Sequence, residues 1–229
     1  MKSTRPLKTH GFTLVELLVV IVIVGSLAAL ALTLGPRMMA RAKFTESMQN
    51  IRQISPLLTT YAADNNMTLP PVEGDVRMAD GTVETLQWNE VCLTLIYPET
   101  ELTVMKNKSW WNANKVVLKN PMFKESTALK PGYAMNENIA SNIDSSNDLT
   151  TAIALSLIPD PTRTPLVAPY TDFRYNFSGG QVASFGKDPQ ATLLSEGKLP
   201  VVFVDGHMET MTPKEYLDRR LNEMPLEDE

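Results

Sequence analysis

The protein has 229 residues, of which 43% are hydrophobic and 21% charged, and its formal net charge is −5. This composition excludes wholesale disorder. The absence of a basic excess gives no support for nucleic acid as the main partner. A single cysteine excludes an intrachain disulfide and a cysteine-rich zinc site, and the two histidines, His10 and His207, are too few for a histidine cluster.

The first eleven residues form a short basic segment, and the next 23 form an apolar run. Residues 12–34 carry one charge, that of Glu16. As a helix this run would reach about 34 Å, enough to cross a bilayer core. The apolar part of a secretory signal has about 7–15 residues and ends at a cleavage site. We therefore expect a membrane span that the mature protein retains.

Glu16 is the unusual residue of this span. A carboxylate in a membrane helix costs about 2.5–3.5 kcal/mol and usually has a function. If the chain were cut between Gly11 and Phe12, the new α-amino group would lie one helical turn before Glu16, because positions i and i+4 share a face. The amine and the carboxylate could then neutralise each other within one chain or between chains.

Residues 11–20, GFTLVELLVV, resemble the class III signal of type IV pilins and type II secretion pseudopilins. The resemblance implies that a prepilin peptidase cuts after Gly11 in the cytoplasm and methylates Phe12, and that Glu16 guides assembly. It also implies that the bulk of the chain lies outside the inner membrane. Charge alone does not decide this, because three basic residues flank the span on each side. The alternative is a signal anchor with an incidental glutamate.

Apolar residues recur at spacings of three and four from Phe44 to Tyr61, which predicts an amphipathic continuation of the helix. We expect one helix from Phe12 to about residue 63, kinked at Pro36 and ended by residues 65–66, with Pro56 as a second candidate for a kink. Residues 40–71 resemble a segment of a pilin-like subfamily that often carries an H-X9-DG element. That segment's cysteine is replaced here by Met48 or a neighbour.

Residues 67–229 are expected to form a β-rich head. The pairs Asp80-Gly81 and Asp205-Gly206 predict two hairpins with two-residue turns, in which both residues have positive φ. A helix is predicted at 88–97, with Val91, Cys92, Leu95 and Ile96 on its apolar face and Cys92 buried. Strands are expected at 115–118, 132–135, 166–167 and 172–177. Thr212 and Glu215 form a capping box that predicts a last helix.

The head shows little sign of catalytic or metal chemistry. Residues 201–211 resemble the hairpin of the H-X9-DG proteins, but Ser195 occupies the expected histidine position, so the resemblance carries no site. His207 is expected to be a solvated strand residue. Asp144, Ser146 and Asp148 place oxygen-bearing side chains at alternate positions, as calcium-binding loops do. Because the segment lacks the turn glycine and the later glutamate of such loops, it is an incomplete candidate for a calcium site. Trp110 and Trp111 are expected to be partly buried residues that anchor a loop. The alternative is an exposed contact patch.

The sequence therefore predicts an α+β, pilin-like fold in which a long N-terminal helix packs on a small antiparallel β head. The expected divisions are a cleaved leader (1–11), a transmembrane half of the helix (12–34), its amphipathic continuation (35–66) and a periplasmic or extracellular head (67–229). The expected role is a subunit of a type II secretion pseudopilus or related filament, with no cofactor and no enzymatic activity. Its expected partners are prepilin peptidase, other pilin-like subunits, the inner-membrane assembly platform and the bilayer. Alternatives are a type IV pilus subunit, or a membrane-anchored binding or enzymatic domain that does not polymerise.

Overall fold

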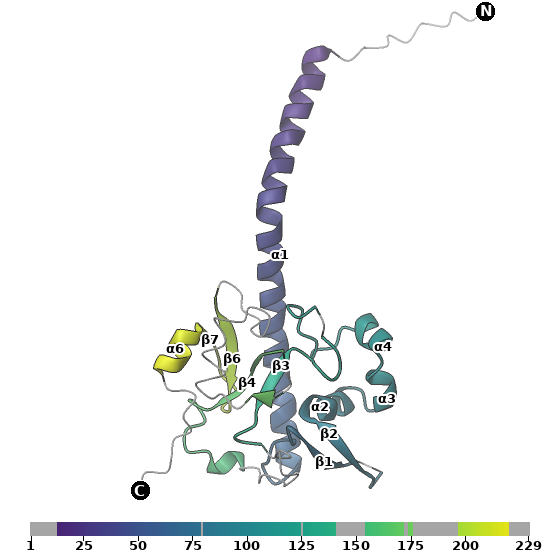
Figure 1. Ribbon diagram of the computed structural model, residues 1–229, viewed down its shortest axis with the longest axis vertical. Helices are drawn as coiled ribbons and strands as arrows, with labels where there is room; N and C mark the ends of the chain where they lie inside the picture. Colours follow the sequence, from purple (N-terminus) through teal and green to yellow (C-terminus); the bar gives the residue numbers. More distant parts are fainter. Residues whose placement is uncertain are drawn as a thin grey trace, which may run out of the picture. The chain divides into compact units, whose positions relative to one another are not determined.

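The computed structural model describes residues 13–78, 80–124, 126–140, 154–171, 174–175 and 197–219. The chain divides into two compact units, Met1–Arg41 and Ala42–Glu229. The fold class is α+β, as predicted, with a long N-terminal helix followed by small sheets (Figure 1).

Helix α1 spans Leu14–Asp64 and contributes to both units. Every residue from 13 to 34 is exposed. In the second unit, buried side chains recur at helical spacing, which confirms the amphipathic continuation: Ser47, Ile51, Ile54, Ser55, Leu58 and Ala62. The helix runs through Pro36 and Pro56, so neither proline ends it. It stops at Asp64, and Asn66 and Met67 take positive φ angles of 54° and 60°. The predicted end of the helix is therefore confirmed.

The second unit continues with a hairpin and three short helices. Strand β1 (Glu73–Arg77) pairs antiparallel with β2 (Val83–Gln87), followed by α2 (Trp88–Ile96), α3 (Leu102–Met105) and α4 (Lys108–Ala113). The hairpin and α2 are as predicted. The apolar face of α2 differs, because Leu93 is buried while Leu95 is 43% exposed. Trp110 and Trp111 lie on α4 rather than in a loop, and Trp111 is fully buried.

A five-stranded sheet has the order β5-β3-β4-β6-β7. Its described strands are β3 (Tyr133–Asn136), β4 (Pro165–Pro169), β5 (Arg174–Tyr175), β6 (Leu199–Phe203) and β7 (Met208–Met211). Neighbours pair antiparallel except β3 and β5, which are parallel over two residues, so the sheet is mixed at one edge. The strands predicted near 132–135 and 166–167 and the hairpin at 201–211 are confirmed, and residues 174–175 lie within the strand predicted at 172–177.

Both Asp-Gly hairpin turns have the same geometry, and it is not the predicted one. The Met78 N–H donates to the Thr82 carbonyl at 2.8 Å, and the Phe203 N–H donates to the His207 carbonyl at 2.9 Å. Three residues lie inside each of these bonds. Among the described residues of the two turns, only the glycines have positive φ, +87° in both cases. Each turn is therefore a three-residue loop with glycine in the left-handed region, so the prediction of two-residue turns is wrong.

The strand predicted at 115–118 is also wrong. Residues 117–119 form a turn, and Val116 and Leu118 are buried separately as anchors. Two short elements complete the described fold, the 3-10 helix η1 (Leu155–Leu157) and α6 (Pro213–Asp218). Thr212 and Glu215 cap α6 reciprocally, as predicted: the Thr212 N–H donates to the carboxylate at 2.7 Å, and the Glu215 N–H donates to the hydroxyl at 3.2 Å.

The main core joins the apolar stripe of α1 to α2, α4 and the five-stranded sheet, whereas the β1–β2 hairpin buries Val76 and Leu86 in a separate cluster with Val91. In Figure 1, hairpin β1–β2 with α2, α3 and α4 lies on one side of the second part of α1, and β6, β7 and α6 lie on the other. Ile51, Ile54 and Leu58 belong to one buried cluster with Trp88, Trp111 and other side chains from the sheet and the loops. The Tyr133 hydroxyl approaches the Ser47 hydroxyl at 3.3 Å, which ties β3 to α1.

Candidate functional site

The first turn of α1 holds the carboxylate of Glu16 in a defined position. Glu16 Oε2 accepts hydrogen bonds from the Thr13 backbone N–H at 2.8 Å and from the Thr13 hydroxyl at 2.7 Å. The Glu16 N–H donates in return to the Thr13 hydroxyl at 3.3 Å. This is a reciprocal capping box at the helix start, where the positive end of the helix dipole favours a carboxylate. The carboxylate therefore faces the N-terminal end of the helix.

The partner of Glu16 expected from the sequence, the Phe12 amine, lies outside the described residues. Gly11 also lies outside them, and α1 begins at Leu14. A shared helical face for Phe12 and Glu16 therefore stays a prediction. The described partner is Thr13, three residues before the glutamate. The Thr-x-x-Glu pattern at 13–16 is itself a capping signal, and it could have identified Thr13 from the sequence.

The first part of α1 exposes a continuous apolar surface. Within the described residues, one helix is long and apolar enough to cross a membrane, and it is α1. Its large apolar side chains up to residue 34 are all exposed: Leu14 is 84% exposed, Ile21 60% and Leu32 79%. A large apolar surface of this kind needs lipid or other protein to cover it.

His207 is held more firmly than expected for a solvated strand residue. Its ring stacks on Phe203, with centroids 4.4 Å apart and planes 2° from parallel. Its Nδ1 lies 2.5 Å from Asp205 Oδ1, and its Nε2 lies 3.4 Å from Glu209 Oε1. Glu209 also binds Arg219, which lowers the pKa of the Glu209 carboxyl. These contacts brace the second hairpin turn against the C-terminal helix.

The structure describes the predicted buried thiol, Cys92, but not the residues of the calcium candidate. Asp144, Ser146 and Asp148 lie outside the described residues, so the weak calcium candidate stays a prediction. In the described part of the chain, no group of three or more His, Cys, Asp or Glu side chains is placed to hold a metal ion. Cys92 is a free, buried thiol, as predicted. Burial raises its pKa to about 12, so it is protonated and unreactive near neutral pH.

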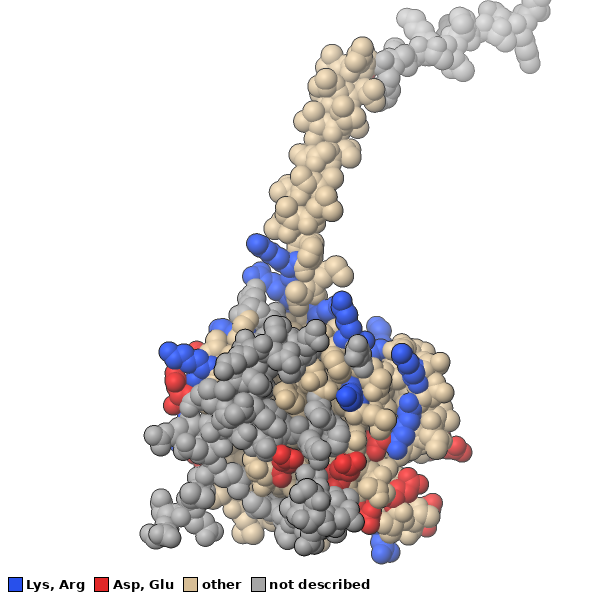
Figure 2. Space-filling view, in the orientation of Figure 1, with Lys and Arg blue, Asp and Glu red and all other residues tan. Residues whose placement is uncertain are grey.

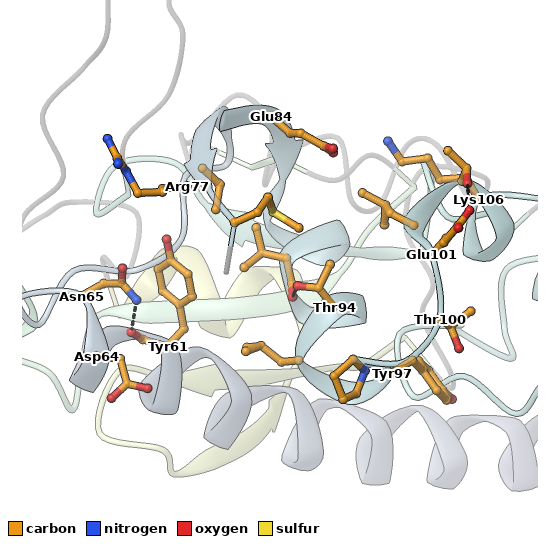
Figure 3. A pocket seen from close by; sticks show the side chains of 17 residues that line it. Tyr61, Asp64, Asn65, Arg77, Glu84, Thr94, Tyr97, Thr100, Glu101 and Lys106 are labelled. Carbon is orange, nitrogen blue, oxygen red and sulfur yellow. Dashed lines mark hydrogen bonds between the residues drawn. The ribbon is translucent and has the colours of Figure 1, made fainter. Parts of the chain in front are cut away.

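A groove of about 640 Å³ was not predicted from the sequence. Figure 3 shows it between the end of α1, the β1–β2 hairpin and the α2–α3 connection. Its apolar lining includes Tyr61, Val91 and Leu95, and its carboxylates are Asp64, Glu84 and Glu101. Lys106 lies at its edge, but its Nζ is 2.7 Å from Glu90 Oε1, a buried carboxylate. The groove forms from residues up to 45 positions apart, so no local pattern in the sequence indicates it.

Two comparisons with known proteins found a match. Residues 7–32 match the family described as "Prokaryotic N-terminal methylation motif". Over 86 residues the chain is 37% identical to the protein named "Type II secretion system core protein G" from Pseudomonas aeruginosa. The matched stretch covers 35% of this chain and 58% of that relative, less than two thirds of its length. No solved structure matches significantly. The resemblance to the pilin and pseudopilin superfamily, seen first at residues 11–20, is thereby confirmed.

Proposed function

We propose that this chain is a pilin-like structural subunit of a type II secretion pseudopilus or a related filament, and that it is not an enzyme. The observation that carries the proposal is the methylation motif at residues 7–32, which runs into an apolar helix long enough to cross a membrane. The similarity to a type II secretion core protein favours a pseudopilus over a type IV pilus.

Processing and location follow from the motif. Prepilin peptidase cuts after Gly11 and methylates Phe12, so that residues 1–11 are a leader and residues 12–34 anchor the chain in the inner membrane. The amphipathic part of the helix, 35–66, joins the anchor to a head formed by residues 67–229 in the periplasm or on a filament. Removing the leader also removes its three basic residues, Lys2, Arg5 and Lys8.

The exposed apolar surface of α1 supports assembly through this helix. In the membrane, lipid covers the side chains of residues 14–34, all of which are exposed within a single chain. In a filament, the same side chains of neighbouring subunits cover one another, because packing removes their apolar surface from water. The apolar surface thus has a suitable environment before and after extraction from the membrane.

The geometry of Glu16 supports its role in assembly. Phe12 is bonded directly to Thr13, whose N–H already donates to the Glu16 carboxylate. A freed Phe12 amine is therefore one residue away from the atom that this carboxylate binds. Inside a bilayer or a filament core, a cation attracts a carboxylate far more strongly than it does in water. We infer that Thr13 satisfies Glu16 in the monomer and that the Phe12 amine of the same or an incoming subunit binds it during assembly.

Replacing Glu16 tests this proposal in cells that carry the assembly machinery. Glu16→Ala removes the carboxylate but keeps helix propensity and apolarity. We expect normal insertion, normal cleavage and a folded head, with loss of helix-to-helix cross-links along residues 14–34 and of filament assembly or secretion. Glu16→Asp should retain part of the function. Glu46→Ala is the matched control, since Glu46 is an exposed glutamate of α1 outside the apolar run. An alanine variant that cross-links and functions like the wild type would make Glu16 incidental.

A further inference from the structure

The head carries two adjacent stretches of opposite charge. Residues 64–105 contain eight acidic residues and one basic residue, whereas residues 106–130 contain six lysines and one acidic residue. In Figure 2, most blue side chains lie over the upper part of the head and most red ones over the lower part, with a few of each among the others. Two of the lysines have described side-chain partners: Lys106 pairs with Glu90, and Lys119 donates to Asn112. Within the described residues, the exposed side chains of Lys108, Lys115, Lys124 and Lys130 have no carboxylate in ion-pair range.

The lysine-rich stretch ends in a hydrogen-bonded turn, residues 126–130, which we name the knob. Its turn is closed by two backbone bonds, Thr127 N–H to the Lys130 carbonyl at 2.9 Å and Lys130 N–H to the Thr127 carbonyl at 3.1 Å. The Ala128 carbonyl accepts a hydrogen bond from the buried Asn89 side chain, which fixes the knob to α2. Leu129 is nevertheless 53% exposed, and Lys130 next to it is exposed. The knob therefore presents an apolar side chain and a positive charge in a fixed geometry.

The acidic groove described above offers the complementary features. Its lining includes the apolar side chains Val91, Leu95 and Leu102. Figure 3 shows Glu84 and Glu101 at its rim, on the hairpin and beside α3. The groove has two basic residues, and one of them, Lys106, is already paired with Glu90. The charge of Arg77 alone is therefore left to balance the three carboxylates that line the groove. No residue of the knob lines the groove of its own chain.

We propose that the knob of one copy of this chain docks into the groove of a second copy, with Leu129 against its apolar lining and Lys130 beside Glu84 and Glu101. This inference rests on the proposed function, which places many copies of the chain in a regular array. Because knob and groove are different surfaces, the contact is heterologous and repeats from copy to copy without closing on itself. The knob is already rigid, so docking costs little conformational entropy. The contact would guide the heads into register while the helices pack.

Cysteine cross-linking in the full-length, membrane-inserted chain tests this docking. Leu129→Cys places a thiol on the knob, and Thr103→Cys places one at the groove, while Cys92 stays buried. A chain with both changes should form an oxidised ladder of dimers, trimers and longer products. Each single variant alone should stay monomeric, and the two single variants expressed together should give dimers only. A strong dimer from Leu129→Cys alone would indicate a symmetric contact and overturn the proposal.

Charge reversal then tests the chemistry of the contact. In the double-cysteine chain, Glu101→Lys should reduce the ladder about tenfold or more, because it places like charges together. Lys130→Glu in the same chain should restore the ladder. Glu99→Lys is the matched control, since Glu99 is exposed and does not line the groove, and it should leave the ladder unchanged. A ladder insensitive to Glu101→Lys, or equally sensitive to Glu99→Lys, would overturn the proposed contact.

Helix cross-links along residues 14–34, measured in the same cells, distinguish failure of the docking contact from failure of the proposed subunit function. If helix cross-links form but knob and groove do not cross-link, the docking contact is wrong and the subunit function stands. If neither forms while the assembly machinery is active, the subunit function itself fails, and the docking contact fails with it.

Discussion

The two parts of α1 belong to one helix but have opposite relations to the rest of the chain. From Leu14 to residue 34 every side chain is exposed, although nearly all are apolar. From Ser47 to Ala62, buried residues recur at helical spacing, and the remaining positions are mostly polar. Ile21 is 60% exposed in the first part, and Ile54 is fully buried in the second.

Isoleucine therefore has a different structural role in the two parts of α1. Isoleucines in the second part stabilise the head, because they pack against its core. Isoleucines in the first part contribute nothing to that core, and their burial requires a bilayer or neighbouring helices. Helix formation is common to both parts, so the hydrophobic pattern, rather than secondary structure, separates anchor from head.

The largest effect should come from removing the anchor. A chain that lacks residues 1–34 keeps the buried stripe of α1 and both sheets. We expect membrane association, measured by flotation and carbonate extraction, to be lost completely. The head should still unfold cooperatively in urea, because its core does not include the deleted residues. A deleted chain that aggregates without a cooperative transition would show that the two parts are not separable.

A paired substitution should sharpen the comparison. Ile54→Ala leaves a cavity in the main core and should lower the unfolding free energy of the head by about 3 kcal/mol. Ile21→Ala makes the same chemical change in the exposed part. It should change head stability by less than about 0.5 kcal/mol. Denaturant unfolding followed by tryptophan fluorescence reports on the head in both variants, since Trp88 and Trp111 lie in that core. Equal losses would contradict the division.

The ion pair between Lys106 and the buried Glu90 should give a smaller effect. The Glu90 carboxylate accepts from the Gln87 N–H at 2.9 Å and pairs with Lys106, which is half-exposed. Lys106→Met leaves the buried carboxylate without its cation and should cost about 2 kcal/mol in urea unfolding. Lys108→Met, at an exposed lysine without an ion-pair partner among the described residues, is the matched control and should be nearly neutral. Adding Glu90→Gln to Lys106→Met should recover part of the loss.

The smallest effect should come from Cys92 at alkaline pH. Its folded pKa is raised to about 12 by burial, above the unfolded value of 9.0. Because the folded pKa is the higher one, this contribution to stability is complete below pH 9 and falls between pH 9 and 12. At pH 10 the loss should be about 1 kcal/mol. The Cys92→Ala variant should lack this component when both proteins are titrated in parallel. Maleimide should label the native wild type only after unfolding, and rapid native labelling would contradict the burial.

Patterns within short stretches of the sequence predicted the helices and hairpins that such short stretches determine. The apolar period predicted both parts of α1, the Thr212–Glu215 box predicted α6, and the Asp-Gly pairs predicted the hairpins. The turn geometry was missed because a three-residue loop needs positive φ only at its glycine. The prediction of a strand at 115–118 failed because Val116 and Leu118 are buried within a loop and do not pair with a neighbouring strand.

The remaining features of the head depend on contacts between distant residues. The Glu90–Lys106 pair and the parallel β3–β5 edge each join residues far apart in the chain. Composition shows that residues 106–130 are rich in lysine, but only the fold shows a rigid knob and a separate acidic groove. For the candidate site the situation is reversed, since the motif at residues 11–16 is local and the sequence alone indicates it. The Thr13–Glu16 bonds add the direction in which the carboxylate points.

The N-terminus of the mature protein tests the central claim most directly. The protein is extracted from membranes of cells with and without prepilin peptidase, and its N-terminal peptide is analysed by mass spectrometry. With the peptidase, we predict a peptide that begins at Phe12 and carries one methyl group on the amine. Without it, or after substitution of Gly11 by a bulky residue, residues 1–11 should remain attached. An intact leader in the wild type with active peptidase would contradict the assignment of this chain as a processed, pilin-like subunit.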